Sequence, residues 1–204
     1  MRHQLARPLS ALFVAAAVLG ARRPAAAQTP SQCDAIAGNL VANCGFETGS
    51  LGGWTVSGDT SNTGVDAYST HSGNYGAYFA NRGPQTLTQT LATVAGTRYT
   101  VSFFLLSEDN PIAAPAFFRA WMGGTQLFDL EGQAPLAYTE YSFTAVATGA
   151  STRMQLLVEN APSFYQLDDL SVTAAATTTP EPASVLLVGA GLLALGAAAR
   201  RRPA

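Results

Sequence analysis

The stretch at residues 99–106, YTVSFFLL, decides the fold class, because β-branched and aromatic residues alternate along it. The alternation places one apolar set on a single face, as expected of a half-buried β-strand: Tyr99, Val101, Phe103 and Leu105. Further segments of this kind, separated by turn residues, lie at 75–80, 86–91, 116–122, 125–130, 138–147, 152–159 and 165–172. We find no 3.6-residue period in the body. The pattern predicts an all-β protein, a two-sheet β-sandwich or jelly roll.

Residues 1–27 have the three parts of a secretory signal peptide. Arg2 and Arg7 are the basic part, residues 9–20 are apolar, and Ala25 and Ala27 are small residues suited to a signal peptidase. The alternative, a permanent membrane helix, needs about 20 apolar residues, more than this run provides. We expect cleavage after Ala27, which leaves residues 28–174 as the folded domain.

Residues 175–204 read as a linker and a membrane tail. Pro180, Glu181 and Pro182 precede an uncharged apolar run at 183–199, which is followed by three arginines: Arg200, Arg201 and Arg202. As a helix this run reaches about 25 Å, just enough to cross a bilayer core. The arginines stay on the cytoplasmic side by the positive-inside rule. We therefore predict a C-terminal transmembrane helix that holds the domain outside the inner membrane.

The order of Pro-Glu-Pro, apolar helix and arginine cluster resembles the PEP-CTERM sorting signal of Gram-negative bacteria. The resemblance implies that an exosortase removes the tail and that the protein is associated with extracellular polysaccharide and biofilm matrix. The expected location is the periplasm, cell surface or extracellular matrix, with membrane anchoring until the tail is processed. A plain anchor helix that is never cut remains an alternative.

The charge distribution makes the exported domain acidic. The chain has no lysine, and between the two tails it keeps four arginines: Arg82, Arg98, Arg119 and Arg153. A domain without a basic patch cannot neutralise many phosphates, which argues against nucleic acid as a partner. An acidic, oxygen-rich domain outside the cell suits a hard cation such as calcium.

Cys33 and Cys44 are the only cysteines. Export places them in an oxidising compartment, where a disulfide is the default state. The alternative, a metal or redox pair, lacks both the CxxC spacing and a neighbouring histidine.

A second resemblance joins the two ends of the domain. Residues 39–49, NLVANCGFETG, with Gly53-Trp54 after them, and the closing LDDLSV at 167–172 resemble the galactose-binding-like, jelly-roll carbohydrate-binding modules. The match spans about 135 residues, and its middle is vague. Cys44 stands where many members have glycine, so the resemblance implies that a Cys33–Cys44 bridge staples the leading strand. It also implies that Trp54 is a core residue.

The resemblance further implies a structural calcium site. In this fold the first and last strands lie close, so Glu47 and Asp168 would share one Ca²⁺ with backbone carbonyls. Asp168 has the strand parity of Leu170 and Val172, which predicts that it faces the core, where an unpaired carboxylate is costly. The alternative is that Asp168 and Asp169 meet backbone amides or arginines.

We find little support for catalysis. No G-x-S-x-G motif is present. His71, the only histidine of the body, lies in a turn-rich stretch that resembles a structural loop of the family. Glu108 and Asp109 are a conceivable glycosidase pair, but neighbouring side chains point apart. We predict that the protein is not an enzyme.

Sugar recognition needs an aromatic face and polar groups that read hydroxyls. Trp121 and Arg119 share a strand face and are the first candidates, and the others are Tyr75, Tyr78, Gln155 and Glu159. The sequence therefore predicts a non-catalytic domain that binds extracellular polysaccharide. The alternatives are a structural matrix protein without a specific ligand and a jelly-roll hydrolase or lyase.

Overall fold

The computed structural model describes residues 29–108, 115–132 and 135–176. The predicted signal peptide with Ala25 and Ala27, and the sorting tail with Pro180, Glu181, Pro182 and the arginine cluster, lie outside these residues. Among the residues described, we find no helix long and apolar enough to span a bilayer.

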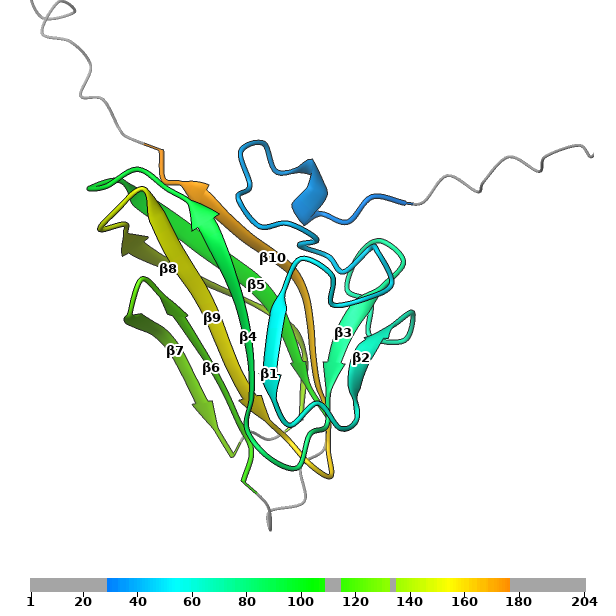
Figure 1. Cartoon of the computed structure of the whole chain (residues 1–204). Coiled ribbons are helices and arrows are strands. Elements are labelled where there is room, and N and C mark those ends of the chain that lie inside the picture. The colour runs from blue at the N-terminus through cyan, green and yellow to red at the C-terminus, as the bar shows by residue number, and fades with distance from the viewer. Residues whose placement is uncertain (1–28, 109–114, 133–134, 177–204) are drawn as a thin grey trace, which may run out of the picture.

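The described chain forms two antiparallel five-stranded sheets packed as a sandwich (Figure 1). The strands are β1 (Thr55–Gly58), β2 (Thr63–Asp66), β3 (Gly76–Phe79), β4 (Gln85–Ala92), β5 (Arg98–Ser107), β6 (Phe117–Met122), β7 (Thr125–Glu131), β8 (Leu136–Val146), β9 (Ser151–Glu159) and β10 (Tyr165–Ala174). Sheet I has the order β1-β4-β9-β6-β7, and sheet II has the order β2-β3-β10-β5-β8. This architecture confirms the all-β, jelly-roll prediction.

The core follows from alternation along the long strands. In β5, Val101, Phe103 and Leu105 are buried between the sheets, and the residues between them face outward. The ring of Phe103 lies within about 6 Å, centroid to centroid, of aromatic rings from both sheets: Phe118, Phe128, Tyr141 and Phe143. Phe103 therefore lies at the packing interface between the two sheets.

Every strand expected between residues 75 and 172 is present, with ends shifted by no more than two residues. The Gly123-Gly124 turn between β6 and β7 has positive φ at both residues, which suits a tight hairpin. Strands β1 and β2 were not predicted from the sequence. Both are short and carry few large apolar side chains, and each is defined by its pairing, with β4 and β3 respectively.

The expected leading strand is wrong: residues 39–54 form turns, and a short 3₁₀ helix, Cys33–Ala35, precedes them. This segment still lies against the last strand, because the Leu40 amide donates to Val172 and the Leu170 amide donates to Cys44. The predicted disulfide between Cys33 and Cys44 is present, with a Cα–Cα distance of 6.0 Å. Trp54 is buried, as expected. Figure 1 shows the segment, in blue, beside the loop that joins β2 to β3.

Candidate functional site

The outer face of sheet I brings together three of the predicted ligand-binding residues. In β6, alternate residues are buried, which turns Arg119 and Trp121 outward. In the neighbouring strand β9, Gln155 lies directly opposite Trp121 in the register. The structure thus confirms that Arg119 and Trp121 share a face and adds Gln155 to it.

A hollow of about 230 Å³ opens on this face beside the indole. Trp121, Gly124, Arg153 and Gln155 line it. Gly124 has a φ of +86°, a conformation that favours glycine, and so it lines the hollow without a side chain. Arg153 was not among the predicted binding residues, although its position two residues before Gln155 in β9 already places both side chains on one face.

Arg119 is held in one orientation by acidic residues of β7. Its Nε donates to Asp129 at 2.8 Å, Nη2 pairs with Glu131, and the guanidinium lies 4.5 Å from the centre of the Phe117 ring. The bond from Arg119 holds the pKa of Asp129 below its usual range. Gln126 also donates to Asp129, at 2.8 Å. These partners could not be predicted from the sequence, because they depend on the pairing of β6 with β7.

Hydroxyl groups extend the same face across β4. In the register, Thr88 lies opposite Gln155 and Thr90 lies opposite Arg153. The buried residues of β4 alternate with these threonines, so the hydroxyls lie on the outer face of sheet I, the face on which the hollow opens. The face therefore combines an indole ring with guanidinium, amide and hydroxyl groups, a combination that can stack on a sugar ring and hydrogen-bond its hydroxyls.

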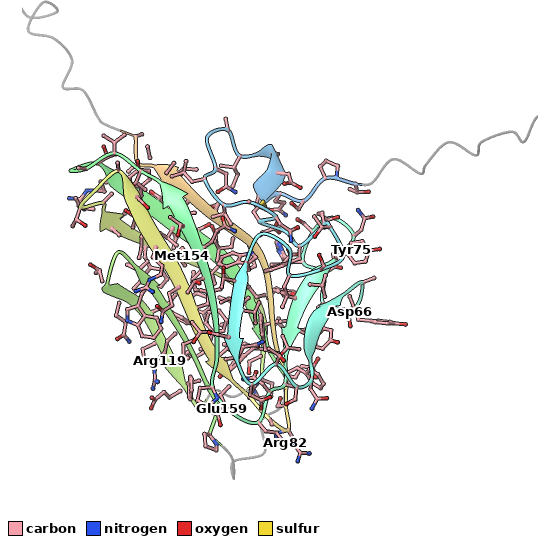
Figure 2. All side chains as sticks on the ribbon, viewed as in Figure 1. Asp66, Tyr75, Arg82, Arg119, Met154 and Glu159 are labelled. Atoms are coloured by element: carbon pink, nitrogen blue, oxygen red, sulfur yellow. A yellow bond between two sulfur atoms is a disulfide. The ribbon has the colours of Figure 1, made fainter. Side chains whose placement is uncertain are left out.

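Glu159 lies on the outward side of β9 but outside this hollow. It is 8% exposed, and it lines a separate depression of about 290 Å³ with Arg82, Pro115, Ala161 and Pro162. Burial raises the pKa of Glu159, and the carboxylate of Asp59 adds to the shift. Figure 2 shows Glu159 and Arg82 together at the lower end of the sandwich. Four residues of strand, roughly 13 Å, separate Glu159 from Gln155.

The two predicted tyrosines lie elsewhere. Tyr78, in β3, faces outward from sheet II, because its neighbours Ala77 and Phe79 are buried. Tyr75 precedes β3 and packs against Gly49, where a Cβ would lie 3.7 Å from the ring. Figure 2 shows Tyr75 and Arg119 on opposite sides of the molecule. The six candidates therefore do not form one site.

The predicted metal ligand Asp168 anchors the loop between β2 and β3. Its Oδ2 accepts from the amides of His71, at 2.8 Å, and Ser72, at 3.0 Å, and its Oδ1 accepts from the Asp169 amide at 2.7 Å. Burial raises the pKa of Asp168 to about 7, the Asp169 carboxylate adds to this, and the amide bonds oppose it. The structure therefore shows the alternative, in which Asp168 accepts hydrogen bonds from backbone amides.

The predicted orientation of Asp168 is wrong. A bulge at Asp168–Asp169, with Asp169 at a φ of +51°, shifts the alternation of β10. Leu167 and Leu170 therefore both face the core, whereas Asp168 lies on the outer side of sheet II, opposite Phe104 in the register. Asp168 is fully buried all the same, because the loop covers it from outside.

The other predicted metal ligand, Glu47, holds the same loop. Its carboxylate accepts from the amides of Asn74 and Tyr75, at 2.9 and 3.1 Å, and from the Asn74 side chain at 2.9 Å. A Cβ on Gly73 would collide with this carboxylate, so glycine is needed for the close approach. Glu47 and Asp168 thus both accept hydrogen bonds from the loop between β2 and β3.

His71 completes the anchor. Its Nδ1 lies 2.7 Å from Asp169 Oδ2, and its ring stacks on Phe104 with the centroids 3.7 Å apart. Ser72 donates to the same carboxylate at 2.7 Å. The Asp169 carboxylate therefore contacts the side chains of both His71 and Ser72. His71 thus has the structural role expected for it.

Calcium at Glu47 and Asp168 stays a prediction. Calcium takes six to eight oxygen ligands. Every carboxylate oxygen of the two residues already accepts at least one N–H, so a cation would have to compete with these donors. Within the described ranges, the one close cluster of potential metal ligands is Cys33, Asp34 and Cys44, whose cysteines are joined in the disulfide. The calcium hypothesis was based on the cost of burying an unpaired carboxylate at Asp168. The hydrogen bonds to backbone amides already pair this carboxylate.

Two family models match the sequence. One, described as a carbohydrate binding domain, matches residues 38–162, which is more than half of the chain. The other, described as a PEP-CTERM protein-sorting motif, matches residues 178–202. None of the curated proteins matches this sequence.

Solved structures share the fold. The structure of TmCBM61 in complex with β-1,4-galactotriose has a TM-score of 0.56 at 22% identity, covering 67% of this chain and 98% of that one. A structure described as Family 16 Carbohydrate Binding Module-2 has a TM-score of 0.51 at 14% identity, covering 66% of this chain and 99% of that one. At these identities the similarity concerns the fold.

Proposed function

Because the chain belongs to the carbohydrate binding domain family, we propose that the outer face of sheet I binds a polysaccharide without transforming it. The observation that supports this most is the grouping of Trp121, Arg153 and Gln155 around the 230 Å³ hollow. An aromatic ring provides the stacking surface, and the amide and guanidinium groups donate to sugar oxygens.

The shape of the face favours a polymer over a free monosaccharide. The polar groups extend across β4, β9, β6 and β7, which is roughly 14 Å at the usual spacing of neighbouring strands. Arg119 is already neutralised by Asp129 and Glu131. Arg153 makes no ion pair with any residue that the structure describes, so the face accepts neutral or acidic sugar units.

The arrangement of acidic groups favours binding over catalysis. A glycosidase needs one carboxyl group that keeps its proton as a general acid. On this face, Asp129 and Glu131 are paired with Arg119, which lowers the pKa of Asp129. Glu159, whose pKa burial raises, lies outside the hollow. Glu108 accepts a bond from Gln166 on the other sheet, and Asp109 lies outside the described residues.

The sorting motif supports a location outside the cytoplasm. We propose that a signal peptidase removes the N-terminal segment and that an exosortase acts at the C-terminal tail, leaving the domain at the cell surface or in the extracellular matrix. A role in biofilm matrix is part of this proposal.

We expect Trp121→Ala to weaken glycan binding about 30-fold, which corresponds to about 2 kcal/mol, because truncation removes the stacking surface. The measurement is isothermal titration of the folded domain with soluble polysaccharides that include β-1,4-galactan. Val146→Ala, an exposed apolar residue of sheet II, is the matched control and should bind as the unaltered domain does. Unchanged binding in both Trp121→Ala and Gln155→Ala would rule out this face. A domain that binds no glycan of the panel would favour the structural matrix protein.

Processing is tested by the intact mass of the protein isolated from its native host. We expect a mass that lacks residues 1–27 and the tail, and that is lighter by two hydrogens because of the disulfide. A protein that keeps the tail would support the uncut anchor helix. A protein with both ends intact would contradict export and sorting together.

A further inference from the structure

A second cavity, of about 400 Å³, lies on the opposite sheet. We propose that it is a second sugar-binding site and that the domain thereby holds two glycan chains at once, one on each face. The class of ligand is taken from the proposed function, whereas the position and chemistry of this site are independent of sheet I.

Aromatic rings supply its stacking surface. Tyr68 is 93% exposed, so its ring is free to stack on a sugar. Tyr78 lies across β2 at Gly64, where a Cβ would come within 2.9 Å of the phenol ring. Phe164 meets Tyr78 edge to face, with the centroids 6.2 Å apart. Glycine at position 64 thus lets Tyr78 lie along one side of the cavity.

Hydrogen bonds fix the polar groups of the cavity before any ligand arrives. Gln166 donates to Glu108 at 2.6 Å, which joins β10 to the end of β5. Asp66 accepts from the amides of Tyr68, at 3.0 Å, and Ser69, at 2.9 Å. The hydroxyl of Tyr138 donates to the carbonyl of Ser69 and holds this loop against sheet II. A preorganised site loses less conformational entropy when it binds.

The charges define the ligand. Asp66 and Glu108 face the cavity, and no arginine is among the described residues that line it. Two carboxylates accept bonds from sugar hydroxyls or amines but repel uronic acids and phosphates. The cavity therefore suits uncharged or amino sugars, whereas the sheet I face, with Arg153, also accepts acidic ones.

The two sites open in opposite directions. Trp121 faces outward from sheet I and Tyr78 faces outward from sheet II, and packed sheets lie about 10 Å apart. A stiff polysaccharide bound along one face cannot reach the other. Occupation of both sites would join two chains, which is a cross-linking activity that a single site cannot have.

The test compares Tyr68→Ala with Trp121→Ala on three immobilised polysaccharides: β-1,4-galactan, chitosan and polygalacturonate. Tyr68 is almost fully exposed, so its replacement should leave the melting temperature unchanged. We expect at least one of the first two glycans to be retained by Trp121→Ala and to bind at least tenfold more weakly to Tyr68→Ala. Tyr68→Phe, which keeps the ring, should restore retention.

Bridging is then measured directly. The unaltered domain is bound to the immobilised glycan that depends on Trp121, and the soluble, labelled glycan that depends on Tyr68 is added. Capture of the label by the unaltered domain, and its loss in Tyr68→Ala, is the expected result. The second site is overturned if no glycan depends on Tyr68, and its charge assignment is overturned if polygalacturonate does. Neither outcome alters the test of the sheet I face, which is decided by Trp121→Ala and Gln155→Ala.

Discussion

Replacing Asp168 by alanine is expected to lower the free energy of unfolding by about 3–5 kcal/mol, because three backbone amides lose their acceptor. The loss should loosen the loop around His71 and Ser72, which also carries the bonds to Asp169. Urea denaturation in EGTA measures the amide bonds without any contribution from calcium. In a domain of this size the change corresponds to a fall in melting temperature of roughly 10–15 °C.

Asp168→Asn is the matched variant. Its amide oxygen can still accept from His71 and Ser72, so we expect it to lose less than half as much stability as Asp168→Ala. Equal losses in the two variants would contradict the hydrogen-bond account. Repeating the measurement with added calcium tests the metal prediction: if Glu47 and Asp168 bind calcium, the ion stabilises the unaltered domain and leaves Asp168→Ala unchanged.

Phe103→Ala is expected to lower the free energy of unfolding by about 3–5 kcal/mol, the usual range for removing a fully buried aromatic ring. The ring is completely buried and contacts aromatic side chains of both sheets, so its removal leaves a cavity at their junction. Urea denaturation followed by tryptophan fluorescence gives the change, and an unaltered slope would show that the two-state transition is kept.

Two variants make this measurement specific. Phe103→Leu keeps part of the volume and should lose less stability than Phe103→Ala, because the remaining cavity is smaller. Tyr68→Ala removes an equally large aromatic ring from the surface and should stay within about 0.5 kcal/mol of the unaltered domain. If Phe103→Ala were as mild as Tyr68→Ala, the placement of Phe103 at the junction of the sheets would be wrong.

The candidate site shows how far sequence patterns reach. Alternation correctly put Trp121 with Arg119, because residues two apart on one strand face the same side of the sheet. It could not place Tyr78 on the other sheet, because that depends on which strands pair. Asp129 was missed for the same reason, because it reaches Arg119 from β7. Arg153 was overlooked although it lies two residues before Gln155 in β9 and lines the hollow with it.

Asp168 shows where local reasoning fails. Counting by twos from Leu170 predicted the wrong side of the sheet, since the bulge at Asp168–Asp169 changes the count. Nothing in LDDLSV by itself predicts a bulge, and the bulge lies where the β2–β3 loop and the opening segment form hydrogen bonds with β10.

The sequence by itself determined eight of the ten strands that the structure describes, their buried faces apart from the bulge in β10, the disulfide partners and the two recognisable motifs. These depend on the period of two, on cysteine chemistry in an oxidising compartment, and on short contiguous patterns. Only the tertiary structure decided which side chains share a face, how Glu47 and Asp168 are satisfied, and that two hollows lie on opposite sheets. Those features arise from contacts between residues far apart in the chain, and strand order and register are not encoded in any single segment.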